Sequence, residues 1–232
     1  MGIISSIIII LLGLFMLRIK TPTTNKIVTL FAIYLFIYKT VEYTLYGLNL
    51  QVSKIPIEYS TITYFLFSIQ VIFGLKSLKP IASFMGFVSG LGYLIVFMFL
   101  ATQYIEHQGQ FTTMMAFFNH SIVFIGSLLL MKSEQFHKID KRAILSFTMI
   151  YLIYVIIVNQ FVIFTQSYIF ILMLLQGDLL ERLVSSGRLS AIDYLSYFLA
   201  IFIIYQLCIQ VFIWLSSRIY QMKRGRKHEY TI

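Results

Sequence analysis

Seven apolar segments, separated by short charged or polar stretches, constrain the fold of this chain more than any other feature. A helix rises about 1.5 Å per residue and the hydrocarbon core of a bilayer is about 30 Å thick, so one crossing needs about 17 to 25 apolar residues. The segments that meet or approach this length are residues 3–17, 27–48, 55–75, 81–100, 112–131, 143–165 and 194–216. The sequence therefore predicts an all-α, polytopic membrane protein with seven transmembrane helices in a single bundle.

The composition excludes a soluble fold. Hydrophobic residues make up 59% of the chain and charged residues only 12%, and the mean hydropathy is +0.86. This is more apolar surface than a soluble core could bury, so membrane lipids are the expected partners. A net charge of +9 would suit nucleic acid, but the basic residues lie in short clusters between apolar segments. We therefore expect no nucleic-acid partner.

The basic residues also predict the orientation, because cytoplasmic loops carry an excess of Lys and Arg. Clusters occur at 18–26, 76–79, 132–142 and 217–232. The intervening loops hold Lys54 alone, then no Lys or Arg, then two Arg balanced by acidic residues. This alternation predicts a multi-pass protein of the cell membrane, with its N-terminus outside and residues 217–232 as a basic cytoplasmic tail.

Polar side chains inside the predicted spans are the main functional candidates. An ionisable group in a span costs about 2.5 to 3.5 kcal/mol on insertion scales. Counting from the helix ends places Lys39, Glu42, Glu58, His120 and Asn159 in the outer half of the membrane. Because these residues come from four different segments, they predict one cavity open to the outside.

Each candidate also has a simpler interpretation. Lys39 and Glu42 are three residues apart and equally fit a structural ion pair. His120 fits a hydrogen-bonded packing residue, and Glu58 fits a carboxylate solvated at the interface. Cys208 is the only cysteine, so no disulfide is expected, and the spacing of His and Glu demands no metal site. No metal or cofactor is therefore predicted.

Short motifs resemble the YwaF-like bacterial membrane proteins over about residues 27–170. Residues 55–62 read Ile-Pro-Ile-Glu-Tyr-Ser-Thr-Ile and resemble that family's Leu-Pro-Leu-His-Leu-Cys-Ser-Ile segment. Residues 117–121, Phe-Phe-Asn-His-Ser, look like its Phe-Phe-x-His-Gly helix. Asn159 followed by residues 166–170, Gln-Ser-Tyr-Ile-Phe, looks like its Asn and Thr-Asn-Tyr-Met-Phe ending.

This family is similar to eukaryotic seven-helix acyltransferases that use a Cys and a His within the membrane, so the resemblance implies chemistry on lipid acyl groups. It maps the nucleophile to Ser60 and the base to His120. The chain departs from the pattern at both Ser60, where the family has Cys, and Glu58, where it has His. A serine needs an activating base, so this hypothesis requires Ser60 and His120 within hydrogen-bond reach.

Three functions remain open at this point. The first is an enzyme acting on lipid acyl groups, with Ser60 and His120 catalytic and Glu42 or Asn159 orienting. The second is a transporter or binding protein for a small polar solute or cation, which would use Lys39, Glu42, Glu58 and His120. The third is a non-catalytic scaffold whose polar layer joins its helices. The sequence predicts neither the substrate nor the oligomeric state.

Overall fold

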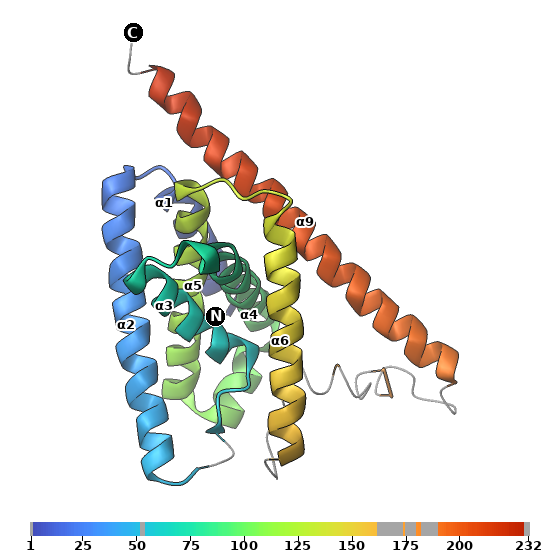
Figure 1. The fold of residues 1–232 in the computed structure, drawn as a ribbon. Coiled ribbons are helices and arrows are strands. Elements are labelled where there is room, and N and C mark those ends of the chain that lie inside the picture. Colours follow the sequence, from blue (N-terminus) through green and yellow to red (C-terminus); the bar gives the residue numbers. More distant parts are fainter. Residues whose placement is uncertain (1, 52–53, 162–173, 175–179, 182–189, 230–232) are drawn as a thin grey trace.

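The computed structural model describes residues 2–51, 54–161, 174, 180–181 and 190–229, and its elements are helices throughout this part of the chain (Figure 1). The prediction of an all-α fold is confirmed. In chain order the elements are α1 (Gly2–Met16), α2 (Thr21–Leu48), α3 (Tyr59–Phe73), the short 3-10 helix η2 (Lys76–Leu78), α4 (Lys79–Gln108), α5 (Gln110–Ser133), α6 (Asp140–Phe161) and α9 (Ala191–Glu229).

Five of these helices are long and apolar enough to cross a membrane, which is the pattern of an integral membrane protein. They are α2, α4 with the η2 turn before it, α5, α6 and the part of α9 up to Gln221. The other two, α1 and α3, have 15 residues each. At about 1.5 Å per residue each is about 22 Å long, shorter than the hydrocarbon core of about 30 Å.

Helix α5 lies at the centre of the bundle. Every residue from Asn119 to Lys132 is buried, because α5 contacts α1, α2, α4 and α9. Its most extensive contact is with α4. Residues 112–131 have no continuous polar face that would be turned to solvent, and a helix that is apolar on all sides is expected in the middle of a bundle.

Two glycines on α4 allow the close approach of α4 and α5. A Cβ atom at Gly90 would lie 2.7 Å from the His120 carbonyl oxygen and 2.7 Å from Phe124 Cβ. A Cβ at Gly86 would overlap the Ser127 hydroxyl. Gly86 and Gly90 form a Gly-x-x-x-Gly pattern, which lets helices in membranes pack backbone to backbone.

The start of α3 differs from the prediction. The segment 55–75 was expected to be helical from its beginning, with Pro56 in the first turn, but α3 begins at Tyr59. The residues before it are held outside the helix by α6, because the Tyr151 hydroxyl donates to the Ile57 carbonyl at 2.7 Å and the Tyr154 hydroxyl donates to the Pro56 carbonyl at 3.1 Å. The proline also disfavours helical backbone at the residue before it.

Two other helices are longer than predicted. The segment 81–100 lies within α4, which continues to Gln108. The connection to α5 is then the single residue Gly109, whose φ of +82° is a backbone conformation open mainly to glycine. Helix α9 continues through the predicted tail to Glu229.

Helix α9 crosses the bundle obliquely and extends beyond it (Figure 1). Its buried side chains, among those described, run from the middle of the helix onward and include Ile209, Phe212 and Ile219. The end of the predicted span 143–165 and the motif at 166–170 fall outside the described residues.

Candidate functional site

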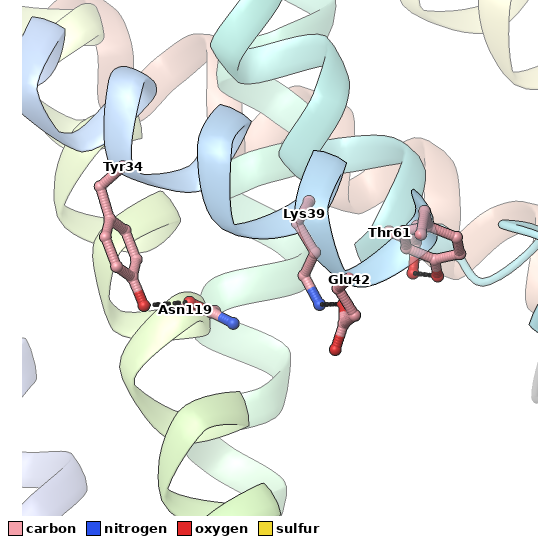
Figure 2. A network of polar contacts seen from close by, with 6 residues as sticks. Tyr34, Lys39, Glu42, Thr61 and Asn119 are labelled. Atoms are coloured by element: carbon pink, nitrogen blue, oxygen red, sulfur yellow. Dashed lines mark hydrogen bonds and ion pairs between the residues drawn. The ribbon is translucent and has the colours of Figure 1, made fainter. Parts of the chain in front are cut away.

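A partly buried ion pair on α2 is the main charged feature of the described bundle. The Lys39 ammonium lies 2.6 Å from Glu42 Oε2, and the two side chains are 11% and 25% exposed (Figure 2). The three-residue spacing places both groups on one side of α2. Each charge lowers the cost of holding the other in apolar surroundings, since two paired charges are less costly there than one alone.

Aromatic rings connect this ion pair to the centre of the bundle. The Lys39 ammonium lies 5.2 Å from the ring centroid of Tyr38 and 5.0 Å from that of Tyr64 on α3, within the range of cation–π attraction. The Tyr64 ring meets the His120 ring edge to face, with centroids 5.5 Å apart. His120 in turn stacks on Tyr93 of α4. Contacts from Lys39 to Tyr93 thus cross four helices.

His120 is 8% exposed and is enclosed by these rings. Its Nδ1 atom lies 3.4 Å from the Ser89 hydroxyl on α4. Within the described part of the chain, no hydrogen bond joins His120 to Ser60, which is half-buried in the first turn of α3. Ser60 as a nucleophile therefore stays a prediction.

Two further hydrogen bonds tie α2 to its neighbours (Figure 2). The Tyr34 hydroxyl donates to Asn119 Oδ1 of α5 at 3.3 Å. The hydroxyls of Tyr43 and Thr61 share a hydrogen bond of 3.0 Å, which joins α2 to α3. They fix the face of α2 that carries Lys39 and Glu42 relative to the rest of the bundle.

In the described part of the chain, no hydrogen bond or ion pair joins the side chain of Glu58 or Asn159 to Lys39, Glu42 or His120. Glu58 precedes the first residue of α3, and its side chain does not cap the helix. Its position is set by the hydrogen bonds from Tyr151 and Tyr154 of α6 to the backbone just before it. Asn159 is half-buried near the end of α6 and has no side-chain hydrogen bond to another described residue.

A groove of about 600 Å³ runs along α2 beside the ion pair. Its lining comes from one face of the helix: Tyr34, Ile37, Tyr38, Val41, Glu42, Leu45 and Tyr46. Of the candidate site residues, only Glu42 lines it. The outward polar cavity that the sequence predicted stays a prediction, because this groove is lined by three aliphatic side chains, three tyrosines and one carboxylate. In the described residues, no three His, Cys, Asp or Glu side chains gather as metal ligands.

Sequence reasoning missed Ser89, Tyr64, Tyr93 and Asn119, which together surround His120 and Tyr34. Tyrosine and serine are common in membrane helices, so their identity alone gave no signal. The pair Gly86 and Gly90 could have given one, because close packing of α4 on α5 brings Ser89 and Tyr93 to His120.

Comparison with protein-family models, with curated proteins and with solved structures finds no match for this chain. The class of protein consequently rests on the chain itself, whose described residues form helices, five of them apolar and long enough to span a membrane.

Proposed function

We propose that this chain is a seven-span membrane protein that binds an amphiphile from the outer leaflet in the groove along α2. The seven-span topology is supported by seven helices that overlap the seven predicted segments, and by basic clusters at alternate ends of those segments. The two short helices fit this topology if neighbouring chain completes the crossing.

For α3, the four residues 55–58 supply the missing length. Fully extended, four residues would add about 13 Å, and the turn closed by the Ile57 N–H and the Ile55 carbonyl makes the actual contribution smaller. Non-helical backbone is tolerated at membrane depth only where protein groups satisfy it. The hydrogen bonds from Tyr151 and Tyr154 to the carbonyls of Ile57 and Pro56 meet that requirement.

The observation that carries the binding proposal is the carboxylate of Glu42 in a groove whose other lining residues are three aliphatic side chains and three tyrosines. The exposed side chains of Ile37, Val41 and Leu45 fit the alkyl chain of the ligand. The Glu42 carboxylate accepts hydrogen bonds, so it selects a head group that donates them, such as an ammonium or hydroxyl group. The Lys39 ammonium lies 2.6 Å from Glu42 Oε2 and holds the carboxylate in place beside the groove.

The test is photolabelling of the protein in nanodiscs with a long-chain alkylamine that carries a diazirine in its chain. We expect labelled peptides to contain Ile37, Val41 or Leu45, and we expect Glu42→Gln to reduce this labelling severalfold. Glu106→Gln is the matched control, because Glu106 is an exposed carboxylate at the end of α4. Labelling spread equally over α6 and unchanged by Glu42→Gln would contradict the proposal.

A second candidate function, chemistry on lipid acyl groups, is favoured by one contact. His120 lies within 3.4 Å of a serine hydroxyl, that of Ser89, and a histidine beside a serine is the arrangement that activates this nucleophile. The resemblance to the YwaF-like proteins favours Ser60 instead. A serine-reactive fluorophosphonate probe separates the two. Both hypotheses expect His120→Ala to abolish labelling. The nucleophile is then the serine, Ser60 or Ser89, whose replacement by Ala also abolishes it. An unlabelled, folded wild type would exclude an activated serine.

A further inference from the structure

A second cavity, of about 370 Å³, lies at the basic end of the bundle. It forms where the connection between α5 and α6 meets the start of α4 and the second half of α9. Its lining includes Lys76, Ser77, Phe136, His137, Ala143 and Tyr220. Its volume falls within the range of about 300 to 1,000 Å³ that is usual for small-molecule pockets.

The two acidic residues of the lining already have partners. Glu134 Oε2 lies 2.7 Å from the Lys79 ammonium. Asp140 Oδ2 accepts a hydrogen bond of 2.7 Å from the backbone N–H of His137, and Asp140 also occupies the first turn of α6, where a negative charge is favourable. The charge of each carboxylate is therefore partly balanced within the protein, by an ammonium group for Glu134 and by the start of α6 for Asp140.

The remaining polar groups of the lining favour an anion. The Lys76 ammonium has no ion pair with any described carboxylate, and Ser77 and the His137 ring offer further hydrogen-bond donors. The field around the cavity is positive as well, because residues 76–79 and 134–142 hold five basic side chains against two acidic ones. The aromatic ring of Phe136 is buried beneath it.

We infer that this cavity binds a phosphate-bearing group, supplied by the head group of an anionic lipid. The cavity lies at the ends of α4, α5 and α6, where membrane helices meet the head-group layer. In the predicted topology this is the cytoplasmic face, and basic pockets between helices on that face suit anionic head groups. The inference does not depend on the groove along α2, which is lined by other residues.

The test is native mass spectrometry of the purified protein with phosphatidylglycerol, and separately with soluble glycerol phosphate. Lys76→Gln removes the unpaired ammonium, and Ala143→Leu fills the cavity without changing the charge. Lys138→Gln is the matched control, because Lys138 is an exposed lysine of the same connection that does not line the cavity. Circular dichroism checks that each variant is folded.

We expect Lys76→Gln to weaken phosphatidylglycerol binding about tenfold, through the loss of one charge-assisted contact, and Ala143→Leu to weaken it about as much by occupying the space of the head group. Lys138→Gln should leave binding nearly unchanged. Glycerol phosphate bound with the same pattern, without lipid, would assign the phosphate site to soluble esters rather than to lipid. Equal loss in Lys76→Gln and Lys138→Gln, or no bound phosphate compound in the wild type, would overturn the inference.

Discussion

The imidazole of His120 lies flat against the ring of Tyr93, with centroids 4.0 Å apart and ring planes 4° from parallel. The stack joins the central helix α5 to its closest neighbour, α4, at the level of the Lys39–Glu42 pair. The polar layer of the bundle is therefore built around an aromatic contact, and its stability is open to direct measurement.

Two substitutions of His120 separate the contribution of its aromatic ring to stability from that of its ring nitrogens. An aromatic pair contributes about 0.5 to 1.5 kcal/mol beyond its area, so we expect His120→Ala to lower the free energy of unfolding by at least that amount. His120→Phe keeps a ring between Tyr64 and Tyr93 and should remain close to the wild type. Thermal unfolding in detergent measures both, and an equal loss in the two variants would show that the ring itself is not the stabilising feature.

Because Lys39 and Glu42 form an ion pair, we expect substitutions of the two residues to have non-additive effects on the free energy of unfolding. Lys39→Met leaves the Glu42 carboxylate without its partner in an apolar layer, which should destabilise the protein by about 1 to 3 kcal/mol. Adding Glu42→Gln to that variant should restore part of the loss. A double-mutant cycle on unfolding free energies gives the coupling, and purely additive losses would mean that the two charges are independently solvated.

The close approach of α4 and α5 provides a matched pair of glycine substitutions. Gly90→Ala places a methyl group 2.7 Å from the His120 carbonyl oxygen, whereas Gly92→Ala meets nothing within 4 Å. Overpacking costs about 1 to 3 kcal/mol, while an exposed helical Gly→Ala change is worth up to about 1 kcal/mol in the opposite direction. We expect the melting temperature to fall for Gly90→Ala and not for Gly92→Ala. The reverse order would contradict the packing described.

The backbone just before α3, residues 55–58, is held in place by tyrosine hydroxyl groups of α6. Tyr151→Phe keeps the ring that packs on Tyr59 but removes the hydrogen bond to the Ile57 carbonyl, at a cost of about 1 kcal/mol. Amide hydrogen exchange in a peptide covering residues 55–62 should become faster, while a peptide from the centre of α5 should not change. Unchanged exchange in residues 55–62 would mean that α6 does not hold this segment.

The helices were predictable because runs of apolar residues leave few alternatives in lipid, and the Lys39–Glu42 pair was foreseen as one option because both lie on the same helix. Helix ends were harder. Residues 101–108 are polar enough to resemble a loop, yet they stay helical until the positive φ of Gly109. Pro56 indicated a first helical turn, but tyrosines of α6, about a hundred positions away in the chain, hold that backbone out of the helix.

Partners contributed by other helices could not be read from local patterns. His120 was identified as a candidate from its place in a span, but the serine beside it, Ser89, is brought there by packing of α4 on α5. Glu58 and Asn159 were placed in the same layer by counting residues. Depth along a helix does not determine the direction of a side chain around it, and no hydrogen bond or ion pair among the described residues joins either of these two to His120.

Cysteine accessibility tests the membrane topology most directly. In a Cys208→Ser background the chain has no other cysteine, so single cysteines can be placed at Ser77 and Gln108, which lie at opposite ends of the η2–α4 span, and at Lys138 and Gln51. An impermeant maleimide should label positions 51 and 108 in right-side-out vesicles, and positions 77 and 138 only in inside-out vesicles. Labelling of positions 77 and 108 from the same side would show that α4 does not cross the membrane, and the proposed topology would be wrong.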